Sequence, residues 1–155
     1  MRLEPILKPD LTLCVDDVAD RDDLLHRLAK IASSQIPTQS VESIFHALEA
    51  REEQTPTATS EGVAFPHAML DDVGETLLIV MKLTSGVSFT SSDLPASDII
   101  FCMIGSAGKP WAHVRLLARL ARIARGVGAL DRLRAATTAD ELFERLIEED
   151  RAHGE

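Results

Sequence analysis

The sequence predicts an α/β fold, a single-domain sandwich with a central, mostly buried β-sheet, mixed or parallel, covered by helices on both faces. Two near-continuous apolar runs, at 77–83 and 99–104, are typical of central strands that are covered on both sides. Amphipathic helical patterns precede and follow these runs along the chain. A length of 155 residues suits one domain with a sizeable core.

The first third of the chain predicts a strand and two helices. Residues 1–19 form an extended lead-in, in which apolar residues alternate over 11–15 as they would in a short strand. Apolar residues then recur on one face over 22–35, which predicts a helix. Ser40 is a good N-cap for a second helix over 41–53.

The remaining elements are a short strand and two further helices. A brief apolar run at 63–65 predicts a third strand. Residues 110–126 form the longest predicted helix, because a proline in its first turn is followed by a leucine-rich stripe. The capping box formed by Thr138 and Glu141 opens a last helix over 139–149.

Composition limits the classes of protein to consider. A net charge of −9 argues against nucleic-acid binding and against attachment to a membrane surface, because both need a positive field. No apolar run approaches the roughly 20 residues that would span a bilayer. Cys14 and Cys102 are far apart in sequence, which suggests a reducing compartment, so we expect a cytoplasmic protein. We expect one domain over 1–155, with its core at about 5–148 and a polar tail at 150–155.

Residues 51–67 are the stretch with the clearest signs of chemistry. They run from a charged helix end through a loop rich in Thr and Ser to a short apolar run that ends in Pro66 and His67. His67 can be a nucleophile beside an anion-binding loop, or it can simply end a strand with water or a carbonyl as its partner. Arg51 lies in the last turn of the predicted helix, where the helix dipole alone would also favour a cation.

His113 is a second candidate, and it falls near the start of the predicted helix 110–126. Unpaired backbone N–H groups favour an anion there, although an ordinary surface histidine is the alternative. We expect no metal site, because the chain has neither His-x-x-x-His nor Cys-x-x-Cys spacing. On the same helix Arg115, Arg119 and Arg122 form a stripe, with Arg125 close by, which is either a solvated face or a docking face for an acidic partner.

Several of these residues occur in an order that characterises a known family. The sequence resembles the IIA domain of the fructose/mannitol class of the bacterial phosphoenolpyruvate-dependent phosphotransferase system, including its nitrogen-regulatory members, over residues 5–148. The matching segments are Arg51-Glu52, Thr57, Glu61-Gly62-Val63-Ala64-Phe65-Pro66-His67, Gly86-Val87-Ser88-Phe89 and His113-Val114-Arg115-Leu116-Leu117-Ala118.

The resemblance implies a role for each candidate residue. His67 would accept a phosphoryl group from the phosphocarrier protein HPr or a close relative, and no cofactor or metal would be needed. His113 would donate a hydrogen bond to the transferred group, and Arg51 would help to stabilise its charge. Arg51 and the helix N-terminus should also lower the pKa of His67. The phosphoryl oxygens could be held by the loop hydroxyls, those of Thr57, Thr59 and Ser60.

One stretch departs from the family pattern. The family loop reads Thr-Gly-Ile-Gly, whereas this chain has Thr57-Ala58-Thr59-Ser60. Glycine permits a positive φ and close approach to an anion. Either the loop follows another path, with hydroxyls substituting for N–H groups, or the phosphate site is degraded.

Three functions therefore stay open. The first is a phosphocarrier of the nitrogen-regulatory type, which we favour because no IIB or IIC domain is fused to the sequence. The second is a regulatory module of the same fold that binds a target protein without efficient phosphorylation. The third is a free-standing sugar-transport IIA component that works with a separate IIB component.

Overall fold

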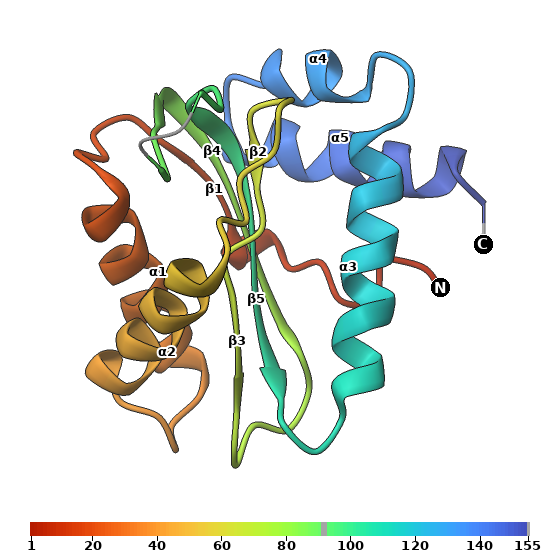
Figure 1. Ribbon diagram of the computed structural model, residues 1–155. Coiled ribbons are helices and arrows are strands. Elements are labelled where there is room, and N and C mark those ends of the chain that lie inside the picture. The colour runs from red at the N-terminus through yellow and green to blue at the C-terminus, as the bar shows by residue number, and fades with distance from the viewer. Residues whose placement is uncertain (91–92, 155) are drawn as a thin grey trace.

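Two long antiparallel strands form the centre of the structure, a computed structural model that describes residues 1–90 and 93–154. A mixed sheet lies between α1 and α2 on one side and α3 and α5 on the other (Figure 1). The predicted α/β sandwich is therefore confirmed, and its sheet is mixed. The described elements are a 3₁₀ turn Pro9–Leu11, β1 Thr12–Val15, α1 Arg21–Gln35, α2 Val41–Gln54, β2 Val63–Ala64, β3 His67–Leu70, β4 Leu77–Val87, β5 Ser97–Ser106, α3 Pro110–Ala124, α4 Ala129–Arg134 and α5 Ala139–Ala152.

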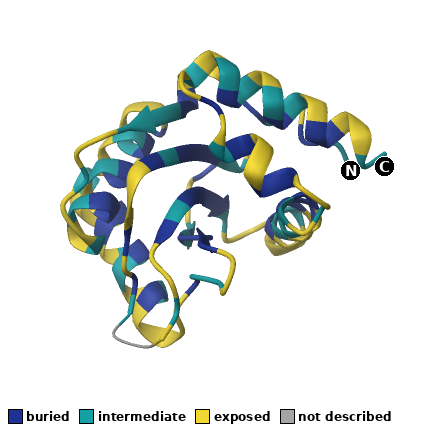
Figure 2. Ribbon diagram, turned by 90° about the horizontal axis from the view of Figure 1, so that it is seen from above, coloured by how far each residue is buried: buried dark blue, intermediate teal, exposed yellow. Residues whose placement is uncertain are grey.

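The two apolar runs form β4 and β5, as predicted, and both strands extend beyond the runs. They pair antiparallel, while β1 pairs parallel to β4 on the far side. Alternate residues of β5 enter two different cores, so Cys102 packs beneath α1 and α2, and Phe101 packs beneath α3, α4 and α5. The strands in Figure 2 are accordingly mostly buried, whereas the helices alternate between buried and exposed positions.

The strands β2 and β3 are two pieces of one edge strand. Val63 pairs with Ile99 and His67 pairs with Met103, so the register along β5 is the same before and after the interruption. Pro66 lies in that interruption. Its carbonyl accepts from the N–H of Met103 on β5 at 3.0 Å, but Pro66 has no N–H to donate in return, which interrupts the ladder at this point. The prediction that His67 ends a strand is wrong, since His67 begins β3.

Several helix boundaries differ from the predictions. The helix α3 ends at Ala124, and the chain then forms the short α4, which follows a left-handed Gly128 with φ 72° and was not predicted. The helix α5 continues to Ala152, so the predicted polar tail is wrong over 150–152, while residue 155 lies outside the described part of the chain. None of the described helices has the length and apolar character needed to cross a membrane.

A buried ion pair joins the two ends of the described chain. The carboxylate of Asp150, fully buried, accepts hydrogen bonds from the Leu3 N–H at 2.9 Å and the Glu4 N–H at 3.0 Å. Arg119 donates to the same carboxylate through Nε at 2.9 Å and a terminal nitrogen at 2.7 Å. Burial raises the pKa of Asp150, but these hydrogen bonds outweigh it and hold that pKa below its ordinary value.

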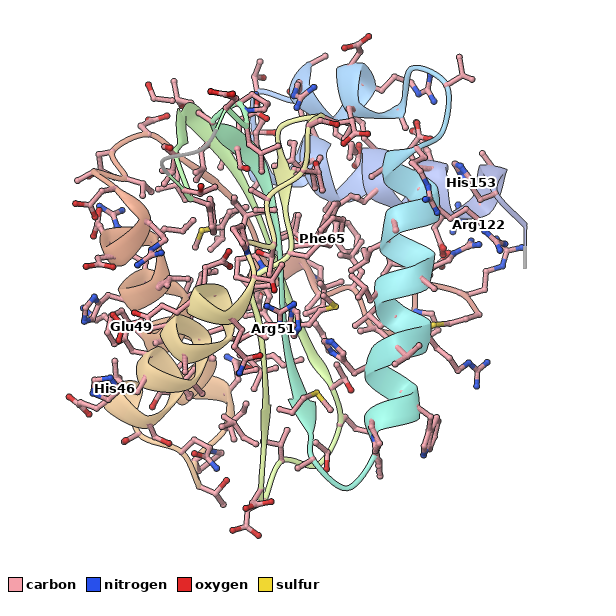
Figure 3. All side chains as sticks on the ribbon, viewed as in Figure 1. His46, Glu49, Arg51, Phe65, Arg122 and His153 are labelled. Atoms are coloured by element: carbon pink, nitrogen blue, oxygen red, sulfur yellow. The ribbon has the colours of Figure 1, made fainter. Side chains whose placement is uncertain are left out.

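The expected arginine stripe is therefore wrong for one of its members. Arg119 is 4% exposed and belongs to the core rather than to the surface. Arg115, Arg122 and Arg125 are exposed, and Figure 3 shows Arg122 on the side of α3 that faces away from the sheet. A docking role for these three residues stays a prediction.

Candidate active site

Three of the predicted side chains meet at the open edge of the sheet. Arg51 comes from the last turn of α2, His67 from the first residue of β3 and His113 from the start of α3. In Figure 3 Arg51 points from α2 toward the strands. These residues, with Gln54 and Met69, line an open cavity of about 370 Å³.

The hydrogen bonds of His67 define its tautomer. Its Nδ1 lies 2.8 Å from the carbonyl oxygen of Phe65, which can only accept, so Nδ1 carries the proton. Its Nε2 accepts a hydrogen bond of 3.0 Å from Nε of Arg51, and therefore has a lone pair. Arg51 also donates to the carbonyl of Thr55 at 2.8 Å, which holds the guanidinium at the helix end. The ring is thus a neutral imidazole with its nucleophilic nitrogen directed at a cation.

The surroundings of His67 keep it neutral near pH 7. Burial lowers its pKa most, and the positive charge of Arg51 lowers it further. The hydrogen bond to the Phe65 carbonyl and the charge of Glu52 act in the opposite direction, but the net effect is a lowered pKa. The charge of Arg51 thus acts in the predicted direction, although burial contributes more. A contribution from the helix N-terminus stays a prediction.

His113 lies against His67 and is buried. The two ring centroids are 4.7 Å apart, with 40° between the ring planes. Burial, then the charges of His67 and Arg51, lower the pKa of His113 to about 4, so this ring is also neutral at pH 7. Its Nδ1 is buried and has no hydrogen-bond partner among the described residues. A polar group left without a partner in this way can bond to an incoming ligand.

Gly105 makes room for this arrangement on β5. A Cβ at this position would lie 2.8 Å from Sδ of Met69 and 3.6 Å from Cβ of His113. The first distance is too short for a real contact, so a side chain here would displace Met69 from the wall of the cavity.

The hydroxyl of Thr57 is already engaged. Glu52 accepts from the Thr57 hydroxyl at 2.7 Å and from the Thr57 N–H at 2.6 Å. Both residues are buried. The structure therefore gives the Thr57 hydroxyl to a carboxylate rather than to the cavity.

Thr59 and Ser60 lie at the tip of a hairpin that leads away from His67. The N–H of Phe65 donates to the carbonyl of Thr57, and the N–H of Thr59 donates to the carbonyl of Val63, so the chain folds back on itself over these residues. The Thr59 hydroxyl bonds within the hairpin, to the Val63 carbonyl at 3.0 Å. The structure does not bring Thr59 or Ser60 to the histidine.

The other end of α3 confirms this separation. Thr59 lines a different cavity together with Arg125, which lies 12 positions after His113 in the sequence. An α-helix rises about 1.5 Å per residue, so roughly 18 Å of helix separates the two sites. The hairpin tip and the histidine pair are therefore at opposite ends of α3.

The unusual composition of the loop causes no backbone strain. Ala58 bridges antiparallel to Ala64, and neither Ala58 nor Ser60 has a positive φ. Gly62, with φ 80°, supplies the left-handed residue that the tip requires. The loop backbone therefore needs no glycine at 58 and 60. Its hydroxyls do not replace N–H groups at the histidine, however, because those of Thr57 and Thr59 bond to Glu52 and to the Val63 carbonyl.

Glu52 is the residue at this site to which no role was given from the sequence. The sequence predicts a role for its neighbour Arg51 in stabilising the phosphoryl group, whereas Glu52 appears there only as part of the Arg51-Glu52 pair. Glu52 follows Ile44 and Leu48 at four-residue intervals, on the buried face of α2. A carboxylate on an apolar stripe is the signal that would have found it.

Comparison with known proteins gives the family. Residues 5–149 match the sequence model of the family described as phosphoenolpyruvate-dependent sugar phosphotransferase system, EIIA 2. The chain belongs to this EIIA 2 family. The resemblance inferred from Arg51-Glu52, the segment 61–67 and His113 is thereby confirmed. Among the described residues, no group of three His, Cys, Asp or Glu side chains could hold a metal ion.

Curated relatives of this EIIA 2 protein cover nearly its whole length. A nitrogen regulatory protein of Pseudomonas aeruginosa is 28% identical, with 96% of each chain covered. Another from Bradyrhizobium diazoefficiens is 27% identical, covering 92% of this chain and 93% of the relative. Each is a protein to which this chain is similar.

Solved structures show the same fold. The nitrogen regulatory protein IIA-Ntr of Neisseria meningitidis superposes with a TM-score of 0.82 at 23% identity, covering 93% of this chain and 98% of that one. The mannitol IIA of Escherichia coli gives a TM-score of 0.71 at 18% identity, covering 90% and 98%.

Proposed function

We propose that this EIIA 2 protein is a phosphocarrier that accepts a phosphoryl group on Nε2 of His67. The observation that carries the proposal is the state of this ring, a neutral imidazole whose Nε2 lone pair faces the cavity wall formed by Arg51 and His113. An unprotonated nitrogen of a neutral ring is the form that attacks phosphorus, once the hydrogen bond from Arg51 is given up.

Phosphoryl transfer to His67 forms one N–P bond and breaks another. Nε2 of His67 attacks the phosphorus of a phosphohistidine on the donor protein, and a new N–P bond forms as the N–P bond of the donor breaks. The electron pair of the broken bond stays with the donor imidazole, which leaves neutral if its other nitrogen is protonated. The Nδ1 proton of His67 remains in place, so the phosphorylated ring carries a positive charge that the Phe65 carbonyl partly offsets.

The neighbouring side chains stabilise the transferred group. Arg51 donates to Nε2 in the structure, and on attack its guanidinium would turn to the phosphoryl oxygens. The neutral His113 ring has a buried Nδ1 without a partner among the described residues, and with its proton on that nitrogen it would donate a hydrogen bond to a phosphoryl oxygen. No group in this reaction needs a cofactor or a metal, since positioning and oxygen charge are its main demands.

The donor that we propose is an HPr-like phosphocarrier, and the role that we propose is regulatory. Relatives over nearly the whole chain are named nitrogen regulatory protein, which supports regulation through a target protein. A similar chain of known structure is the mannitol IIA in complex with phosphorylated IIB from Escherichia coli, at 20% identity. Passage of the group to a separate sugar IIB component is therefore the second candidate.

Intact-protein mass spectrometry at mildly alkaline pH tests the acceptor directly. The protein is incubated with phosphoenolpyruvate, enzyme I and HPr, because phosphohistidine survives at that pH. We expect one acid-labile phosphoryl group on the wild type and none on His67→Ala. His46→Gln is the matched control, since His46 is exposed on α2, and it should be labelled like the wild type.

Two outcomes would change the assignment. Undiminished labelling of a folded His67→Ala would contradict it. A well-folded wild type that takes no group from several HPr-type donors would favour a protein-binding module that works without phosphorylation. Transfer onward from labelled protein to a purified IIB component would favour the sugar-transport role over the regulatory one.

A further inference from the structure

Glu52 is a buried carboxylate one residue from Arg51, and the phosphoryl transfer described above makes no use of it. It is 3% exposed, and its two oxygens both accept hydrogen bonds from Thr57. No lysine, arginine or histidine among the described residues forms an ion pair with it, and a carboxylate is rarely buried without a specific reason. Its hydrogen bonds to Thr57 indicate a role in holding the loop that follows α2.

A chain of hydrogen bonds leads from Glu52 to His67. Glu52 fixes the backbone N–H and the hydroxyl of Thr57, at 2.6 and 2.7 Å. The carbonyl of Thr57 accepts from the N–H of Phe65 at 3.3 Å. The carbonyl of Phe65 in turn accepts from Nδ1 of His67 at 2.8 Å. The first link consists of two hydrogen bonds and the other two of one each, so Glu52 contributes to the orientation of the last carbonyl.

Arg51 and Glu52 thus act on opposite nitrogens of one ring. Arg51 donates directly to Nε2, while Glu52 acts on the Nδ1 side through Thr57 and Phe65. Because the two residues are consecutive on α2, they point in different directions, one into the cavity and one into the loop behind it. Two consecutive residues at the end of α2 therefore influence the hydrogen bonds of both ring nitrogens of His67.

We propose that Glu52 is a positioning residue for phosphoryl acceptance: by holding Thr57 with both carboxylate oxygens, it fixes the Phe65 carbonyl that keeps the proton of His67 on Nδ1 and leaves Nε2 unprotonated. The consequence for transfer rests on the proposed function. The effect on the His67 tautomer does not, because it concerns the unphosphorylated protein.

The variants Glu52→Gln and Glu52→Ala test whether the hydrogen bonds to Thr57 matter, because only the first variant keeps them. In Glu52→Gln one oxygen still accepts from the Thr57 N–H, and the amide can donate to the Thr57 hydroxyl, which turns to accept. In Glu52→Ala both contacts are lost, and the hairpin is released at its base. Glu53→Ala is the matched control, since Glu53 is the next residue, carries the same charge and is exposed.

Two readouts are measured on these variants. Nitrogen-15 NMR shifts of the His67 ring report the tautomer, and the initial rate of labelling from phosphorylated HPr reports acceptance. For Glu52→Ala we expect a mixture of tautomers and a rate lower by about 10- to 100-fold, as misplacement of a reacting group predicts. Glu52→Gln should restore the Nδ1–H tautomer and most of the rate, and Glu53→Ala should match the wild type in both.

A second pair of variants covers the case in which Glu52→Ala does not fold. Thr57→Val removes the hydroxyl and keeps the N–H, so it should mix the His67 tautomers to a smaller degree than Glu52→Ala. Thr57→Ser keeps a hydroxyl and should restore the Nδ1–H tautomer. A folded Glu52→Ala or Thr57→Val with a pure Nδ1–H tautomer and an unreduced rate would overturn the proposal. If the wild type is not labelled at all, the proposed function fails, while the tautomers still decide whether Glu52 positions His67.

Discussion

Glu52 and Asp150 are two buried carboxylates whose charges are stabilised in different ways. Both accept hydrogen bonds from backbone N–H groups, Glu52 from Thr57 in the loop that follows α2 and Asp150 from Leu3 near the other end of the chain. Asp150 is also paired with the buried Arg119. Glu52 has an arginine beside it in the sequence, yet that arginine donates to His67 instead.

This difference reflects two roles: the Arg119–Asp150 pair stabilises the fold, whereas Glu52 belongs to the candidate active site. A buried pair such as Arg119–Asp150 neutralises both charges and leaves neither available. At the site, an ion pair between Arg51 and Glu52 would hold the guanidinium away from an incoming phosphoryl group. Binding Glu52 with neutral donors keeps Arg51 free to bind an anion, and the following variants test this contrast.

Asp150→Ala should have the largest effect on stability. It leaves Arg119 buried without its partner and two N–H groups unbonded, so the free energy of unfolding should fall by about 3–5 kcal/mol. Urea denaturation measures this, with the exposed Glu148→Ala as control. Labelling of the folded fraction should be unimpaired. A loss below about 1 kcal/mol would show that the pair is no anchor.

His113→Gln should change how stability depends on pH. In the folded wild type the pKa of His113 is about 4, against 6.5 for an ordinary histidine, so the unfolded chain takes up the proton first as the pH falls. The wild type should therefore lose stability between pH 6.5 and 4, by at most about 3 kcal/mol from this group. Denaturation curves at both pH values should show a smaller loss for His113→Gln. Equal losses would mean that His113 is not held neutral.

Arg51→Gln should raise the pKa of His67, because a nearby positive charge is removed from a ring that would otherwise protonate more readily. Stability should change by less than about 1 kcal/mol, since Arg51 is only partly buried. An NMR titration of the His67 ring protons measures the shift. An unchanged pKa would show that burial alone keeps this ring neutral.

Ser60→Gly should have the smallest effect. Its position at the hairpin tip predicts no measurable change in labelling from HPr, in contrast to Arg51→Gln, which should slow it. Parallel labelling time courses compare the two. A faster Ser60→Gly would mean that the tip approaches the phosphoryl group during transfer.

Most of the fold could be predicted because its signals are local. The apolar runs of β4 and β5 and the stripes of the helices depend on residues close in sequence. The resumption of the edge strand at His67 could not be predicted, because Pro66 reads as a stop unless the register along β5 is known. The short α4 gives too few turns for a periodic signal.

The site was predictable in its charges and less so in its geometry. Arg51, His67 and His113 were found from the motif, and they do come together. The roles given to the loop hydroxyls depended on the path of the hairpin, which is set by pairing between 57–59 and 63–65. Proximity in sequence to His67 says little about proximity in space when the chain folds back on itself.

The hydrogen bonds that Asp150 accepts from Leu3 and Glu4 also have a consequence for folding during translation. Leu3, which is fully buried, is separated by 147 residues from the carboxylate that binds its N–H. During synthesis the first residues leave the ribosome long before their partner exists, so this part of the core stays exposed until translation has passed α5. A ribosome stalled earlier would present a chain with its histidine site encoded but its two ends still unjoined, and such a chain is a natural substrate for chaperones and proteases.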